Sequence, residues 1–176
     1  MIAFFLFAAP AEAQPADAPT EIVVTAARSP QPTADTPASV TILDATRIER
    51  LGEPTLPALL RLAPSASISV SGPAGSLSEV RIRGAEANHS LLFIDGIRAN
   101  DPAAGNVPRF ELLNADLVSR IEVVRGPQSA LWGSEAVGGV VAVNGVDAVP
   151  GYRASAEGGS FGFARASASA ALRSGP

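Results

Sequence analysis

The stretches "VRIRGAEANHSLLFIDGIRAND", residues 80–101, and "IEVVRGPQSALWGSEAVGGVVAVNG", residues 121–145, decide the fold. Both consist of short β-prone runs that end at glycine-rich turns, and Asp95-Gly96 is a residue pair typical of a tight turn between strands. Pro127 stands at the head of a short helical turn in the second stretch. We predict five short strands in this region of the chain: "SISVS", "SEVRIRG", "SLLFIDG", "SRIEVVRG" and "GGVVAVNG".

Alternation within two of these runs predicts how the strands are buried. Val80 and Ile82 alternate with two arginines, and Ile121 and Val123 alternate with Glu122 and a valine. Successive side chains of a strand point to opposite faces of the sheet. We therefore expect half-buried strands, with one face in the core and the other in solvent.

Two short helices are predicted on the N-terminal side of these strands. Asp44 can cap the helix "DATRIERLG", which Gly52 ends, and "TLPALLRLAP" begins a second helix at Thr55 that stops at Pro64. Leucines give the second helix an apolar face: Leu56, Leu59, Leu60 and Leu62. Helices followed by short strands and long loops indicate a small α+β domain with a short mixed sheet.

The C-terminal part of the chain alternates with period two. Apolar residues stand at the even positions from Ala164 to Leu172, and "YRASAE" at residues 152–157 alternates in the same way. The segment "GGSFG" between the two runs is typical of a hairpin connection. A hairpin with one apolar and one polar face fits both the wall of an outer-membrane barrel and the edge of a soluble sheet.

The first residues resemble an export signal. Ile2–Ala9 is a compact apolar run and Ala11-Glu12-Ala13 fits a signal-peptidase site, although no Lys or Arg precedes the run. We predict a signal peptide at residues 1–13; a plain hydrophobic terminus is the alternative. Residues 14–37 contain five prolines and predict a flexible tail, in which "EIVVTA" is a β-prone run with no visible partner.

Composition and motifs exclude several functions. The formal net charge of −4 gives nucleic acid no basic surface to bind. The chain has no cysteine and a single His89, so we expect no metal centre built from thiolates or histidines. Serines and acids form no recognisable catalytic set, and no phosphate-binding glycine motif is present. We therefore expect neither an enzyme nor a cofactor.

The two defining stretches, together with "EIVVTAAR" and "IERLGEPTLPALLRLAP", resemble one family, the TonB-dependent outer-membrane receptors, and within it the cobalamin-transporter-like branch. The segment "EIVVTAAR" resembles the TonB box, and the other three segments resemble parts of the plug domain. The resemblance implies a plug domain at residues 38–146, a TonB box at 21–26, and the start of a β-barrel at 147–176. Because a barrel needs many strands of about ten residues each, we expect a receptor cut off just inside its barrel.

The resemblance also implies which residues act. TonB would add a strand to the box, which comprises Glu21, Ile22, Val23, Val24, Thr25 and Ala26. Arg83 and Arg125 would pair with carboxylates of the barrel wall, whereas in an isolated domain such arginines are usually solvated. Two loops, residues 71–78 and 99–109, would contact the substrate.

Five polar residues in these loops are the predicted substrate contacts: Ser71, Ser76, Asn100, Asp101 and Asn106. Asp101 could instead serve in a turn or hold Ca²⁺. The implied substrate is a cobalamin, a siderophore or a similar metal complex, and the implied location is the outer membrane. Two alternatives remain open, a periplasmic binding or decoy protein that engages TonB without transport, and a receptor fragment without function.

Overall fold

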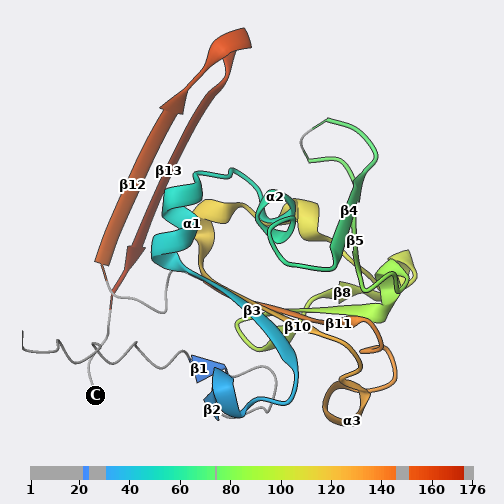
Figure 1. Cartoon of the computed structure of the whole chain (residues 1–176). Helices are drawn as coiled ribbons and strands as arrows, with labels where there is room; N and C mark the ends of the chain where they lie inside the picture. The colour runs from blue at the N-terminus through green and yellow to red at the C-terminus, as the bar shows by residue number, and fades with distance from the viewer. Residues whose placement is uncertain (1–21, 24–30, 74, 146–150, 173–176) are drawn as a thin grey trace, which may run out of the picture.

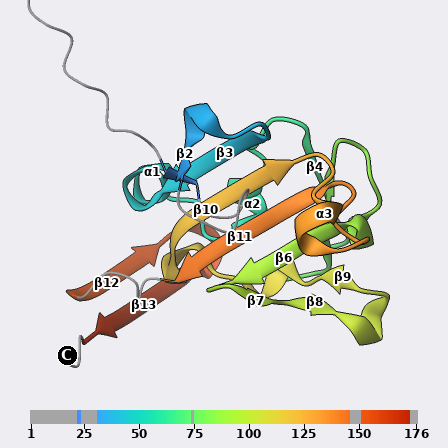
Figure 2. The ribbon, with the colours of Figure 1, turned by 90° about the horizontal axis from the view of Figure 1, so that it is seen from below.

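The computed structural model describes residues 22–23, 31–73, 75–145 and 151–172. A five-stranded mixed sheet forms the centre of the domain, and Figure 2 shows its strands side by side. Their order across the sheet is β3 (Ser39–Asp44), β10 (Val118–Arg125), β11 (Gly139–Gly145), β6 (Ser90–Ile94) and β7 (Ile97–Arg98). β10 is antiparallel to both β3 and β11, whereas β11 is parallel to β6.

One face of the sheet carries the larger core. Ile121 and Val123 of β10 and Leu43 of β3 pack there against helices α1 (Ala45–Leu51) and α2 (Leu56–Leu60). Phe110, from the connection that leads to β10, is completely buried in the same cluster. Fully burying an aromatic ring of this size contributes about 1.5–3 kcal/mol.

The opposite face of the sheet is buried as well. Val124 and Val140 lie there beside Trp132, which belongs to the short helix α3 (Ser129–Trp132). The Trp132 ring centroid is 4.4 Å from that of Phe93. Covering both faces makes β10 a fully buried strand.

The expectation that β10 is half-buried was therefore wrong. Val124 is completely buried and Glu122 is 2% exposed, although alternation placed both on a solvent face. Arg120 on the same strand donates from Nε to Oε1 of Glu122 at 2.9 Å, which compensates the buried carboxylate. The alternation prediction holds for β5 (Ser78–Ile82), where Val80 and Ile82 are buried.

The two helices begin and end close to the predicted residues. The Asp44 side chain accepts a hydrogen bond from the Arg47 N–H at 2.7 Å, and Gly52 ends α1 with a φ of 63°. α2 is shorter than predicted, because the chain turns at Arg61 and leaves Leu62 43% exposed, outside the apolar face.

Short hairpins extend from the central sheet. Asp95 and Gly96 both have positive φ in the tight turn between β6 and β7, as predicted. β4 (Ala66–Val70) pairs with β5, and β8 (Asn100–Asp101) pairs with β9 (Val107–Pro108). Five 3₁₀ turns connect these elements: Thr33–Asp35, Ala87–His89, Pro102–Ala104, Phe110–Leu112 and Ala115–Leu117.

A separate hairpin forms from the C-terminal part of the chain. β12 (Gly151–Gly158) pairs antiparallel with β13 (Ala164–Ala171) across a 3₁₀ turn at Ser160–Gly162, which confirms the predicted hairpin. Figure 1 shows this hairpin standing beside α1, with its turn on the same side of the molecule as the end of the β4–β5 hairpin.

The strand expected to be without a partner has one. β1 (Ile22–Val23) pairs antiparallel with β2 (Gln31–Pro32), with Ile22 opposite Pro32 and Val23 opposite Gln31. The chain therefore folds back on itself between β1 and β2. The Gln31 side chain donates to Thr36 Oγ1 at 2.8 Å, which helps to fix β2. The predicted signal peptide and the other four residues of the hexapeptide lie outside the described residues.

These elements confirm the predicted α+β fold with a small mixed sheet and few helices. No helix within the described part of the chain is long and apolar enough to cross a bilayer.

Phe110 provides a test of the core. We expect Phe110→Ala to lower the free energy of unfolding by about 3–5 kcal/mol, because it removes apolar contacts and leaves a cavity. Leu112→Ala, two residues away at a site that is 70% exposed, is the control and should change the value by less than about 0.5 kcal/mol. Urea unfolding measures both, and equal losses would contradict the assignment of the core.

Candidate functional site

Two arginines meet beside the first residues of β3. Arg83 follows β5 and donates from Nη2 to Ser39 Oγ at 3.4 Å. Arg125 ends β10 and donates from Nη2 to the Val40 carbonyl at 3.5 Å and from Nη1 to the Pro64 carbonyl at 3.4 Å. The fold thus brings together two cations that the sequence separates by more than forty residues.

Neither arginine has an ionic partner within the part of the chain that the structure describes. The Nε atom of Arg125 is buried and has no hydrogen-bond partner there. The two guanidinium groups, held at the start of β3 by long hydrogen bonds and without an ionic partner there, form a site suited to a carboxylate.

Gly126 allows this arrangement. A Cβ at Gly126 would lie 2.6 Å from Arg83 Nη1, and the residue has a φ of 103° that a side chain would strain. The glycine after Arg125 therefore lets the guanidinium of Arg83 lie against the backbone. Arg83 itself has a φ of 54°, which turns its side chain away from the direction of β5.

The loop at residues 99–109 is held by its own polar side chains. Asn100 is buried; it accepts from the Leu92 N–H at 2.9 Å and donates to the carbonyls of Ser90 at 3.1 Å and Asn106 at 2.8 Å. The structure accordingly gives Asn100 a role in holding the loop, since both ends of its amide are used.

The neighbouring polar residues of that loop are also engaged. Asp101 accepts from the Ala103 N–H at 3.0 Å and lies 3.9 Å from Arg109 Nη1. Asn106 accepts from Arg98, whose guanidinium also contacts Glu135. The structure describes no group of three or more acidic or histidine side chains that could hold a metal ion, so it offers no support for Ca²⁺ at Asp101.

The loop at residues 71–78 is more open. Ser71 is exposed and Ser76 is half-buried, and the loop closes through backbone bonds from Ser71 to Leu77 at 3.1 Å and from Ser76 to Pro73 at 3.0 Å. The Ser71 hydroxyl also donates to the Leu77 carbonyl, at 3.3 Å, near the end of the β4–β5 hairpin. The two predicted loops are thus separate surfaces rather than one cluster.

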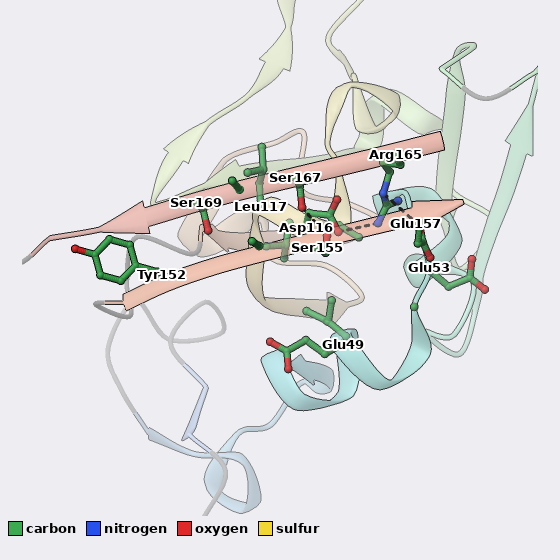
Figure 3. Close-up of a pocket in the computed structure, with 16 residues that line it drawn as sticks. Glu49, Glu53, Asp116, Leu117, Tyr152, Ser155, Glu157, Arg165, Ser167 and Ser169 are labelled. Carbon is green, nitrogen blue, oxygen red and sulfur yellow. Dashed lines mark hydrogen bonds and ion pairs between the residues drawn. The ribbon is translucent and has the colours of Figure 1, made fainter. Parts of the chain in front are cut away.

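The remaining candidate site is a cleft between the domain and the β12–β13 hairpin. It has a volume of about 480 Å³, and Figure 3 shows it running along both strands from Tyr152 at one end to Arg165 at the other. The hairpin contributes polar side chains, among them Ser155 and Ser167, whose hydroxyl oxygens are 2.7 Å apart. The domain contributes α1 and the turn Ala115–Leu117.

An ion pair joins the two walls of this cleft. Arg165 Nη2 donates to Asp116 Oδ1 at 2.7 Å, and Arg165 Nε lies 3.5 Å from Glu157 Oε2 across the hairpin. No sequence motif singled out Asp116 or Arg165. The period-two pattern placed Glu157 and Arg165 on the polar face of one hairpin, but nothing in the sequence indicated the contact with Asp116, 49 residues away.

Comparison with known proteins identifies the domain. The sequence model of the TonB-dependent receptor plug domain matches residues 32–140, more than half of the 176-residue chain. The chain belongs to the TonB-dependent receptor plug family. The matched region and the predicted plug at residues 38–146 overlap over residues 38–140, and the five-stranded sheet is the centre of a plug domain.

Solved receptors share this fold. The siderophore receptor PiuA of Acinetobacter baumannii is 27% identical, with a TM-score of 0.64 over 78% of this chain and 19% of that one. The ferric enterobactin receptor PfeA of Pseudomonas aeruginosa, in complex with BCV-L6, is 26% identical, with a TM-score of 0.52 over 65% of this chain and 18% of that one.

The ferripyoverdine receptor of the Pseudomonas aeruginosa outer membrane, bound to ferripyoverdine, is 19% identical, with a TM-score of 0.66, and shares the fold alone. The alignment covers 83% of this chain and 19% of the receptor. The chain spans about a fifth of the length of the receptors it matches. The narrower resemblance to the cobalamin-transporter branch stays a prediction.

Asn100 gives a test of how the plug holds its longer loop. Asn100→Ala would leave a buried N–H and two carbonyls without their partner, so we expect a loss of stability of about 1–3 kcal/mol or more. Asp101→Ala, which removes one exposed turn bond and a long, exposed ion pair with Arg109, should cost less than half as much. Thermal or urea unfolding of the two variants is the measurement, and a neutral Asn100→Ala would contradict the structural role.

Proposed function

We propose that this chain is the plug and the first wall hairpin of an outer-membrane receptor that imports a metal chelate of the siderophore class with energy from TonB. The observation that carries the proposal is the orientation of the β12–β13 hairpin. Its polar face is turned toward the plug and its apolar face away from the protein.

The strand register makes this orientation explicit. On the inner face Ser155 is opposite Ser167 and Glu157 is opposite Arg165. On the outer face Ala154 is opposite Ala168 and Ala156 is opposite Ala166, and alanines 164, 166, 168 and 170 are all exposed. A hairpin at the edge of a soluble domain would bury its apolar side chains and expose its polar ones. The reverse arrangement is the one that a barrel wall presents to lipid and to its lumen.

The dimensions of the hairpin are close to those of a wall hairpin. Each strand has eight residues, about 26 Å along the strand, and at a tilt of about 40° it covers about 20 Å of the membrane thickness. Aromatic residues stand at both ends, with Tyr152 near the start of β12 and Phe161 and Phe163 at the turn, all of them exposed. Outer-membrane strands carry an apolar band about 25 Å tall between aromatic girdles.

The arginine pair supports a plug that works inside such a wall. Arg83 and Arg125 lie together without an ionic partner among the described residues, and Arg125 has an unused buried donor. We assign their partner to one or more carboxylates that face the lumen of the barrel. Charge-assisted pairs of this kind would hold the plug beside the first residues of β3.

The substrate class follows from the solved relatives. PiuA is a siderophore receptor and PfeA a ferric enterobactin receptor, and both share about a quarter of their aligned residues with this plug. They favour a ferric siderophore over a cobalamin. Within this chain, we assign contact with the substrate to the exposed Ser71 and the half-buried Ser76, whereas Asn100 holds its loop.

The segment Glu21–Ala26 is the proposed docking site for TonB. Ile22 and Val23 already lie in an extended pair with β2, but that pair is only two residues long and Pro32 has no N–H to donate. A longer strand from TonB would form more ladder bonds than β2 provides. It can therefore replace β2 as the partner of the box.

The lipid-facing assignment can be tested with neighbouring residues. In the receptor that carries this chain, Ala166→Arg should place a cation in lipid at a cost of about 2–4 kcal/mol and reduce the amount of receptor in the outer membrane. Ser167→Arg, one residue on, faces the interior and should leave the amount near that of the parent. Quantitative blotting of outer-membrane fractions is the measurement, and equal tolerance of the two arginines would overturn the wall assignment.

The TonB contact can be tested at Val23. Val23→Pro removes a ladder donor, so we expect it to abolish cross-linking to TonB and TonB-dependent uptake of ferric siderophores. Val23→Ala keeps the donor and should retain both. Uptake of radioactive iron and of labelled cobalamin would be followed in parallel. Undiminished cross-linking of Val23→Pro would contradict strand addition. Uptake of cobalamin but not of ferric siderophores by the parent receptor would contradict the siderophore assignment.

A further inference from the structure

The hairpin and the plug are joined by a specific contact. We propose that Asp116 and Arg165 dock the β12–β13 hairpin on the plug and set the position of the two relative to each other. The part that this pair plays in transport rests on the proposed function, whereas the docking itself is a property of the 176-residue chain.

Asp116 is presented by a rigid part of the plug. It lies in the turn Ala115–Leu117, where the Ala115 N–H donates to the Pro54 carbonyl at 3.2 Å and the Leu117 N–H to the Asn114 carbonyl at 3.2 Å. Ala115 is 4% exposed, and β10 begins directly after the turn. The carboxylate is therefore fixed at the entry to the central strand of the sheet.

Arg165 is oriented from the hairpin side. Glu157 is its cross-strand neighbour and lies 3.5 Å from Nε, while Nη2 reaches Asp116 Oδ1 at 2.7 Å. The guanidinium thus lies between one carboxylate of the hairpin and one of the plug. The Arg165 and Asp116 side chains are 25% and 21% exposed, so solvent screens this pair less than a surface ion pair.

The hairpin depends on such an anchor. A two-stranded hairpin is only marginally stable alone in water, and the outer face of this one is exposed. The inner face borders an open cleft, whose lining mixes hydroxyl and carboxylate groups with apolar side chains, rather than a packed core. Figure 3 shows the ion pair at one end of that cleft, where it bridges the hairpin and the plug.

Hydrogen exchange of the purified 176-residue chain, followed by mass spectrometry, tests the docking. Asp116→Asn should accelerate exchange in residues 151–158 and 164–171 about five-fold or more, because the amide keeps an acceptor but removes the charge that strengthens the hydrogen bond. Glu79→Gln is the control, because it breaks an exposed ion pair with Arg81 within the plug and should leave hairpin exchange unchanged.

Rescue by charge exchange separates docking from general destabilisation. Asp116→Arg and Arg165→Asp should each accelerate hairpin exchange, and the double variant should restore protection, because an arginine at 116 can pair with an aspartate at 165 and with Glu157. If Asp116→Asn also loosens β10 and β11, restoration by the double variant decides in favour of docking.

Three results would overturn the proposal: an unprotected hairpin in the parent chain, no acceleration in Asp116→Asn, or no restoration in the double variant. None of these measurements depends on transport. If the receptor imports its substrate but Asp116→Asn does not change hydrogen exchange of the hairpin, the docking pair is refuted and the proposed function stands. If the hairpin depends on Asp116 for protection but the receptor imports no substrate, the docking pair stands and the proposed function is refuted.

Discussion

The pairing of β10 with β3 on one edge and β11 on the other is the interaction on which the rest of the structure depends. Both faces of β10 are covered, so its side chains connect the larger core around the helices with the smaller core beside Trp132. The ends of the same strand carry the functional features. Arg125 at one end joins the arginine pair, and the turn that holds Asp116 precedes the other end.

The local signals in the sequence predicted most of the elements. Asp44 and Gly52 defined the first helix because a cap and a left-handed glycine act within one turn of the chain. The Asp95-Gly96 turn and the period-two hairpin were predicted for the same reason. The burial of Glu122 was not, because the cover on the second face of β10 comes from a segment that alternation in one strand does not describe.

The candidate site was predictable only in part. Arg83 and Arg125 stood out as the arginines before two glycines, and the structure brings both to the start of β3, yet no residue that it describes forms an ion pair with either. Asn100 was selected as a polar loop residue, and only the three hydrogen bonds of its amide reveal a role in loop closure. The contact between Asp116 and Arg165 depends on tertiary packing and left no mark in the sequence.

The position of β3 determines the order in which the sheet can come apart. β3 is an edge strand and shares a ladder with β10 alone in the described sheet, whereas β10 shares ladders with two strands. The proposed TonB box precedes β3 in the chain, and hydrogen bonds of Arg83 and Arg125 lie at the first residues of β3. Tension on the tail would reach this edge first, so β3 could detach one residue pair at a time while β10, β11 and β6 remained assembled.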